Sequence, residues 1–175
     1  MNRLLLLRHA KAAPQVEDEA ADRARPLAPR GEHAAAAIGR WLAAQDFAPD
    51  LVLCSTALRA RQTLERVLVA LPGKPRVIFE DALYLADVPT LLARLRAVEP
   101  GRGCVLLVGH NPGLHELAAA LARDGSARLV RRLRDNMPTG ALAGFELAAG
   151  WSSLGREPAR LTAYVTPKEL GRDDE

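Results

Sequence analysis

Four residues of types that can bind and transfer a phosphoryl group stand at or just after the ends of short apolar runs. They are Arg8, His9, Arg59 and His110. An arginine guanidinium is always charged and pairs its planar donors with two phosphate oxygens, which a lysine cannot do. A neutral histidine is a nucleophile, and a protonated histidine donates a hydrogen bond to a phosphoryl oxygen. If the four side chains converge, they predict a phosphate pocket that contains its own nucleophile.

The apolar runs predict the strands that must bring these residues together. Four runs lack polar alternation, which is typical of central strands in a mostly parallel sheet covered on both faces: residues 4–7, 51–54, 77–79 and 104–108. Helical spacing separates them, over residues 31–44, 56–71, 89–98 and 112–122. Further strands are expected over 140–147 and 160–165, the second at an edge. The alternation predicts an α/β fold, a three-layer α/β/α sandwich with a mostly parallel central sheet.

In open α/β sheets the ligand crevice lies outside the carboxyl ends of the strands. Parallel strands would therefore gather the two arginines and two histidines at one edge. Asn111 is expected to cap the following helix, with Pro112 as its first residue, so that free backbone N–H groups add to the anion attraction. Asn111 is thus a candidate substrate-binding residue. Glycines 109 and 113 are expected to let the backbone pass close to the ligand.

Length and composition fit one domain over residues 1–175, because 49% of the residues are hydrophobic and can form a real core. No segment reaches the roughly 18 apolar residues of a membrane span. The first apolar run has four residues, against about 7–15 in a secretory signal peptide. We therefore expect a cytoplasmic protein with no membrane partner. The polar connection 12–29 is unusually long and is expected to be functional, and the tail 171–175 is expected to fray.

The charge pattern gives little reason to expect a nucleic-acid partner. The net charge is +3 and the pI is near 9.2, but acidic residues interleave with the basic ones everywhere except in the stretch 128–134. We interpret that stretch as the solvated face of a helix, with docking of an acidic partner as the alternative.

The remaining cysteines and histidines do not form a metal motif. Cys54 and Cys104 lie in apolar runs without CxxC or His/Cys spacing, so we predict buried reduced thiols. His115 follows His110 by five residues, a spacing that does not share a helix face, and HExxH is absent. His33 is expected near a helix start and exposed. No metal and no cofactor is expected.

Ordered motifs along nearly the whole chain resemble one family. Segment 6–12, LLRHAKA, resembles the Arg-His motif of the histidine phosphatase superfamily, with Ala10 where many members carry Gly. Segments 25–31, 55–63 and 108–112 follow in the family's order. The chain is similar within this superfamily to the SixA-type phosphohistidine phosphatases, which implies a phosphoglycerate mutase-like fold.

The resemblance implies a role for each of the four residues. His9 would be phosphorylated transiently, Arg8 and Arg59 would bind the phosphoryl oxygens, and His110 would stabilise the transferring group. Charge on the equatorial oxygens dominates phosphoryl transfer, and arginine and histidine charge can stabilise it without a metal. Water would then hydrolyse phospho-His9.

One departure from the wider superfamily bears on the substrate. Mutases and many ester phosphatases carry an acid after the third strand to protonate the leaving oxygen. Here Leu85 aligns with that acid, although Glu80 or Asp81 could substitute. An alkoxide leaving group depends strongly on a general acid, whereas an imidazole is a better leaving group. The missing acid therefore favours phosphohistidine over phosphate esters.

Three functions remain open. The leading one is a phosphatase acting on a phosphorylated protein, such as a histidine phosphotransfer domain. The second is a phosphatase of small phosphate esters, and the third is a non-catalytic module that binds phosphorylated partners. We expect a monomer that binds no nucleic acid.

Overall fold

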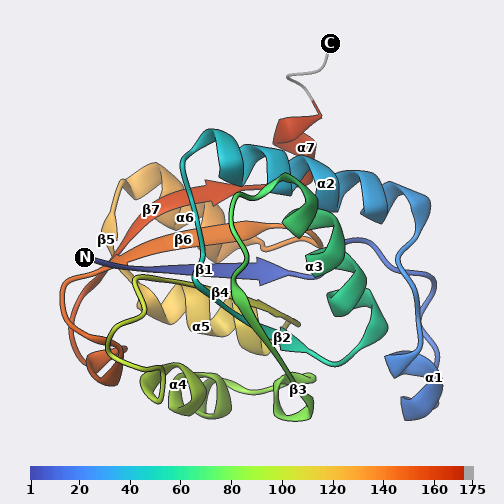
Figure 1. The fold of residues 1–175 in the computed structure, drawn as a ribbon, viewed down its shortest axis with the longest axis horizontal. Coiled ribbons are helices and arrows are strands. Elements are labelled where there is room, and N and C mark those ends of the chain that lie inside the picture. The colour runs from blue at the N-terminus through green and yellow to red at the C-terminus, as the bar shows by residue number, and fades with distance from the viewer. Residues whose placement is uncertain (172–175) are drawn as a thin grey trace.

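The computed structural model describes residues 1–171, in which seven strands form one sheet in the order β3-β2-β4-β1-β6-β7-β5 (Figure 1). The tail expected to fray lies outside the described residues beyond Gly171. The strands are β1 (Asn2–Arg8), β2 (Leu51–Ser55), β3 (Arg76–Glu80), β4 (Cys104–Gly109), β5 (Ala122–Gly125), β6 (Leu142–Leu147) and β7 (Ala159–Val165). The helices are α1 (Glu19–Arg23), α2 (Pro29–Ala44), α3 (Leu58–Ala70), α4 (Val88–Arg96), α5 (Gly113–Leu121), α6 (Ala127–Asp135) and α7 (Pro167–Leu170), with 3-10 turns η1 (Asp81–Leu83) and η2 (Trp151–Ser153).

The sheet is mixed but mostly parallel, as predicted. Strands β3, β2, β4 and β1 are parallel neighbours, whereas β6 runs antiparallel to both β1 and β7. The prediction that segment 160–165 forms an edge was wrong, because β5 pairs in parallel with the outer side of β7. Strand β5 escaped prediction because its sequence, ARDG, carries no apolar pattern.

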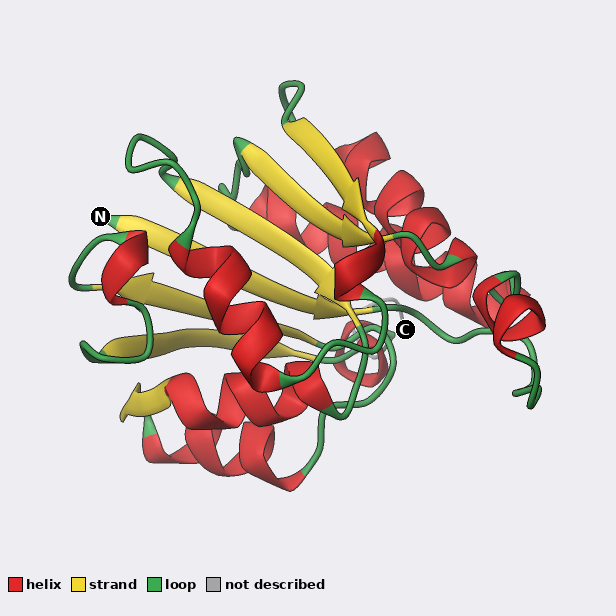
Figure 2. Cartoon of the chain, turned by 90° about the horizontal axis from the view of Figure 1, so that it is seen from below, coloured by secondary structure: helices red, strands yellow, loops and turns green. Residues whose placement is uncertain are grey.

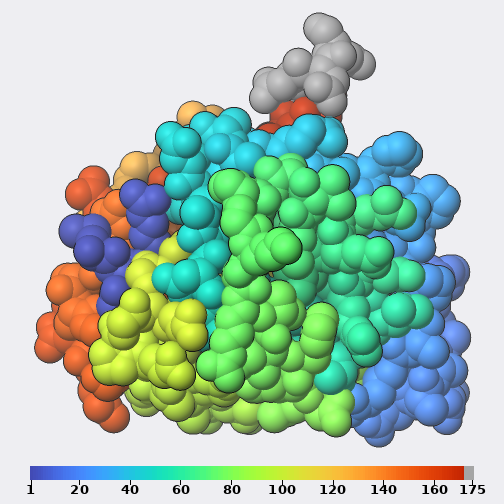
Figure 3. Space-filling view, viewed as in Figure 1, coloured from blue at the N-terminus to red at the C-terminus, as the bar shows by residue number. Residues whose placement is uncertain are grey.

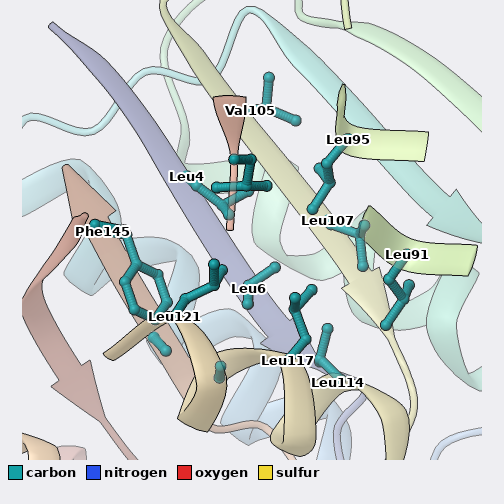
Figure 4. Close-up of a cluster of buried hydrophobic side chains, with 14 of the residues drawn as sticks. Leu4, Leu6, Leu91, Leu95, Val105, Leu107, Leu114, Leu117, Leu121 and Phe145 are labelled. Atoms are coloured by element: carbon teal, nitrogen blue, oxygen red, sulfur yellow. The ribbon is translucent and has the colours of Figure 1, made fainter. Parts of the chain in front are cut away.

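Side chains of the central strands are buried on both faces of the sheet, which explains their unbroken apolar runs. Leu4 and Leu6 pack with residues of α4 and α5, as Figure 4 shows, while Leu5 and Leu7 pack with residues of α2 and α3. Figure 2 shows helices on both faces of the strands. The predicted three-layer α/β/α sandwich is confirmed.

The run 77–79 was predicted to be a central strand, and this was wrong. Strand β3 lies at the edge of the sheet, and Phe79 is 44% exposed. The guanidinium of Arg61 covers its ring at 4.8 Å from the centroid. A run of three apolar residues is too short to distinguish an edge strand from a buried one.

The long connection 12–29 contains a helix that the sequence pattern did not reveal. Helix α1 begins after Asp18, whose carboxylate accepts the Ala21 N–H at 2.9 Å. The helix lies beyond the ends toward which the parallel strands point (Figure 1). In the space-filling view, this blue segment forms the lower right of the molecule and abuts the green residues of α3 (Figure 3). Among residues 1–171, no helix combines the length and the apolar character that crossing a bilayer requires.

Candidate active site

The carboxyl ends of β1, β2 and β4 bring the four predicted residues together. Arg8 pairs with Gly109 across β1 and β4, so His9 and His110 leave the sheet side by side, with ring centroids 5.2 Å apart. Arg59 is the second residue of α3, the helix that follows β2, and is 2% exposed. Sheet topology therefore places the two arginines and two histidines where the spacing predicted them.

The backbone fixes the tautomer of His9. Its Nδ1 lies 2.8 Å from the carbonyl oxygen of Ala10. A carbonyl only accepts hydrogen bonds, so Nδ1 carries the hydrogen and the lone pair of the neutral ring is on Nε2. Burial, reinforced by the positive charges of Arg59 and Arg8, lowers the pKa of His9 to about 4. At neutral pH the ring is therefore uncharged and nucleophilic at Nε2.

His110 is oriented by a buried hydroxyl. Its Nε2 lies 2.7 Å from Ser55 Oγ, which accepts the Ala57 N–H at 3.2 Å. When the Ser55 hydroxyl donates to Nε2, the proton of the neutral ring sits on Nδ1. Burial and the positive groups around the ring lower the pKa of His110 to about 3.

The two guanidinium groups retain donors that no atom of residues 1–171 satisfies. Arg8 Nη1 donates to the Met137 carbonyl oxygen at 3.0 Å, yet Arg8 Nε is buried without a partner. Arg59 Nε and His110 Nδ1 are likewise buried and unpartnered among the described residues. Burial and the charge of Arg59 lower the pKa of Arg8, so the two cations destabilise each other. An oxyanion bound here would satisfy this set of donors and relieve the repulsion.

A threonine joins the two halves of the pocket. Thr63 Oγ1 accepts the Ala10 N–H at 3.0 Å and donates to the Arg59 carbonyl oxygen at 2.7 Å. Thr63 is fully buried. It therefore fixes the backbone beside His9 relative to the helix that carries Arg59.

Asp22 is a site residue that sequence reasoning missed. Its carboxylate accepts hydrogen bonds from Arg59 Nη2 at 3.1 Å, from Arg25 Nε at 2.9 Å and from the Tyr84 hydroxyl. Arg59 Nη1 also donates to the Asp22 carbonyl oxygen at 2.8 Å. Burial alone raises the pKa of Asp22, but the Tyr84 hydrogen bond and the charges of Arg59 and Arg25 hold that pKa below its ordinary value. The carboxylate is therefore ionised at neutral pH.

Neither acid considered as a proton donor contacts the four central residues. Glu80 accepts both of its described hydrogen bonds from Arg94 Nε, at 2.7 and 2.9 Å. The side chain of Asp81 is 81% exposed and accepts from Thr56 Oγ1 at 2.5 Å. Leu85 is 52% exposed with a positive φ of 49°. The carboxylate that reaches the pocket is that of Asp22.

The segment after His110 differs from the prediction. Helix α5 begins at Gly113 and makes no side-chain cap, so Asn111 is not its N-cap and Pro112 is not its first residue. Asn111 Nδ2 instead donates to the Met137 carbonyl oxygen at 2.9 Å. A Cβ at Gly113 would lie 1.9 Å from the Ala86 carbonyl oxygen, so this glycine serves packing rather than approach to a ligand.

The cysteines and outlying histidines have structural surroundings. Cys54 and Cys104 are buried free thiols, as predicted, and burial raises their pKa values to about 12 and about 11. His115 Nε2 lies 2.6 Å from the Leu133 carbonyl oxygen. His33 is exposed on the first turns of α2, as predicted.

A hollow of about 890 Å³ lies beside the pocket, between α2, α6 and α7. Its lining includes Lys11, two residues after His9 in the sequence. It also includes Asn136 and Pro138, the two neighbours of Met137. We name it the basic groove after the lysines and arginines of its lining, which are Lys11, Arg30, Arg40, Arg132 and Lys168. Arg132 belongs to the basic stretch 128–134, which forms most of α6 and whose other arginines are exposed, as the solvated-helix interpretation predicts.

Comparison with known proteins agrees with this arrangement. The family model of the histidine phosphatase superfamily, branch 1, matches residues 4–84. The phosphohistidine phosphatase SixA of Escherichia coli K12 is 34% identical over 121 residues, which are 67% of this chain and 73% of that protein.

Two solved structures of proteins described as SixA are similar over nearly their whole length. The protein from Nakamurella multipartitia is 34% identical with a TM-score of 0.83, covering 95% of this chain and 96% of the other. A SixA complex with tungstate is 27% identical with a TM-score of 0.78, covering 96% and 99%. With its phosphoglycerate mutase-like sheet and paired histidines, the chain belongs to the histidine phosphatase superfamily, among its SixA-type members.

Proposed function

We propose that this phosphatase hydrolyses protein phosphohistidine through a phospho-His9 intermediate. The observation that carries the proposal is the convergence of a neutral His9 with the unpartnered buried donors of Arg8, Arg59 and His110. A module that only binds phosphate needs the donors but has no use for a nucleophile whose Nε2 is kept free. Tungstate is an oxyanion with a shape similar to phosphate, and its complex with a SixA protein is consistent with an oxyanion site.

In the first step His9 Nε2 forms a bond to phosphorus as the bond from phosphorus to the leaving atom breaks. The electron pair of that bond stays on the leaving group. Arg8, Arg59 and His110 Nδ1 would donate to the equatorial oxygens, which carry most of the charge in the transition state. Asn111, whose amide donor is used on Met137, would support Arg8 through their shared acceptor rather than bind phosphate.

In the second step water attacks phospho-His9, and the electron pair of the P–N bond returns to Nε2. Both water protons leave with the product as dihydrogen phosphate. The Ala10 carbonyl keeps Nδ1 protonated throughout, so the departing group is a neutral imidazole rather than its anion. No metal is needed for either step.

The substrate assignment rests on the leaving group and on the relatives. Leu85 stands where ester phosphatases of the family carry a proton donor, and Glu80 is held by Arg94. An imidazole can leave without such a donor. One similar relative is named phosphohistidine phosphatase SixA, and one similar solved structure carries the same description.

The basic groove suits a protein substrate better than a small one. Its cationic side chains outnumber the one acidic lining residue, Asp135, and they lie outside the phosphate pocket. An acidic surface of the phosphorylated partner would dock there by charge complementarity while its phosphohistidine enters the pocket.

Rapid-quench experiments with a 32P-labelled histidine phosphotransfer domain test the proposal. Wild type should pass through an acid-labile, base-stable phospho-His9, and His9→Ala should release no phosphate. A panel of phosphohistidine, sugar phosphates and nucleotides should give the highest kcat/KM for phosphohistidine. Full phosphate release by His9→Ala, or a preference for the esters, would overturn the proposal.

A further inference from the structure

The carboxylate of Asp22 lies at the rim of the pocket, outward of the buried catalytic groups. His9, His110 and Arg59 are 7%, 3% and 2% exposed, whereas the side chain of Asp22 is 16% exposed. A phosphoryl group carried on a protein must enter from solvent, so its leaving group remains on the outer side. Asp22 stands on that side, bound to the same Arg59 that we propose binds the phosphoryl oxygens.

The hydrogen bonds of Asp22 leave one acceptor position. A carboxylate has about four acceptor sites. Arg59 and the Tyr84 hydroxyl use two of them on Oδ2, and Arg25 uses one on Oδ1. The position that remains is on Oδ1, and no hydrogen bond from the described residues uses it.

We propose that Asp22 makes the pocket selective for phosphoryl groups carried on nitrogen, by accepting the N–H of a protonated leaving group. This inference rests on the proposed function and narrows its substrate class to phosphoramidates, with phosphohistidine as the example. The imidazole of phosphohistidine has a second nitrogen, and P–N cleavage releases a neutral imidazole only when that nitrogen is protonated. A phosphate ester has no N–H at the corresponding place.

The reaction is then nearly symmetric in its two imidazoles. Ala10 O holds a proton on the nitrogen of His9 that does not bond to phosphorus, and Asp22 would hold the equivalent proton on the substrate. Phosphoryl transfer forms the bond from His9 Nε2 to phosphorus and breaks the substrate P–N bond, whose electron pair returns to the leaving imidazole. Neither proton moves, so the charges balance without a general acid at Leu85.

Charged and titratable groups surround Asp22 from several elements. Arg59 of α3, Arg25 after α1 and Tyr84 after η1 contact it directly. Arg23 stacks over the Tyr84 ring at 4.0 Å, and the Tyr84 ring meets the His110 ring edge-on at 5.5 Å. These groups keep Asp22 ionised, so an N–H donor meets a negative oxygen.

Asp22→Asn, assayed on two substrates, tests the inference. Phosphohistidine needs a proton on its leaving group, whereas p-nitrophenyl phosphate releases a phenolate that leaves without one. We expect the kcat/KM for phosphohistidine to fall at least tenfold further than that for p-nitrophenyl phosphate. Asp81→Asn, which removes a neighbouring carboxylate without contact to Arg59, should leave the ratio of the two substrates as in wild type.

The pH dependence separates this role from simple support of Arg59. A protonated imidazole ring in water loses its extra proton above about pH 6.5. Without the Asp22 carboxylate to retain that proton on the substrate ring, the phosphohistidine defect of Asp22→Asn should grow from pH 6 to pH 8. Equal losses on both substrates, or a defect independent of pH, would overturn the inference. Failure of wild type to hydrolyse phosphohistidine would instead refute the proposed function. Residual p-nitrophenyl phosphate hydrolysis reports that the variant is folded.

Discussion

Ser55 Oγ lies 2.7 Å from His110 Nε2, and both side chains are buried. The hydroxyl fixes the ring orientation, and Nδ1 on the other side of the ring is buried without a partner among the described residues. Ser55→Ala should therefore lower kcat about tenfold, which corresponds to one hydrogen bond of about 1.4 kcal/mol in the transition state. Steady-state kinetics on p-nitrophenyl phosphate measure the change. Thr56→Ala, whose hydroxyl contacts Asp81 instead, is the matched control, and an equal loss in both variants would contradict the assignment.

The two neutral histidines predict how stability depends on pH. The unfolded chain takes up protons on histidine below about pH 6.5, whereas folded His9 and His110 resist protonation to about pH 4 and about pH 3. The contribution of these two histidines to the free energy of unfolding is therefore fully present above about pH 6.5. It falls as the pH drops below that value, by about 1.4 kcal/mol per pH unit for each histidine. Urea unfolding of wild type and His110→Asn between pH 5 and pH 7 should show a shallower slope in the variant. Exposed His33→Asn is the control, and identical slopes in all three proteins would refute the prediction.

Loss of the Thr63 hydroxyl should lower both the stability and the activity of the protein. Thr63→Val keeps the shape but strands the Ala10 N–H, and leaving a buried donor unsatisfied costs about 1–3 kcal/mol. The free energy of unfolding should fall by that amount, and kcat should fall because Arg59 loses its tie to the strand end. Thr63→Ser retains the hydroxyl and should keep kcat closer to wild type. If Thr63→Val and Thr63→Ser lose activity equally, the methyl group rather than the hydroxyl matters.

Charge reversal in the basic groove tests the docking surface. The double variant Arg30→Glu, Arg40→Glu should raise KM for a phosphorylated protein substrate at least tenfold, because like charges then face its acidic surface. Small substrates should be affected less than threefold, a rough limit for rim charges far from the reacting group. The double variant Arg66→Glu, Arg76→Glu changes the net charge by the same amount at two exposed arginines outside the groove lining, and it is the control. A change of the same size on small substrates would argue against docking.

The central part of the fold was predictable because burial on both faces forces long apolar runs. Strands β1, β2 and β4 carry such runs, and their parallel order alone sets Arg8, His9 and His110 at one edge. Strand β5 and helix α1 are short and polar, so their formation depends on the tertiary contacts around them.

The same contrast holds in the site. The arginines and histidines were identifiable by type and spacing, but the groups that orient them were not. Ala10 and Met137 act through backbone carbonyls, which every residue type has, so the sequence cannot indicate them. Asp22 lies on the short helix α1, and it joins the site only because the fold brings α1 against Arg59. The sole signal was the unusual length of the connection that contains it.

A single oxygen atom, the carbonyl of Met137, accepts from both Arg8, the last residue of β1, and Asn111, which follows β4. Insertions or deletions around position 137 would therefore disturb both strand ends at once, however distant they look in an alignment. Attempts to redesign the substrate range of such enzymes should keep the spacing of this loop constant. Changes placed at the outer rim, around α1, leave that common anchor untouched.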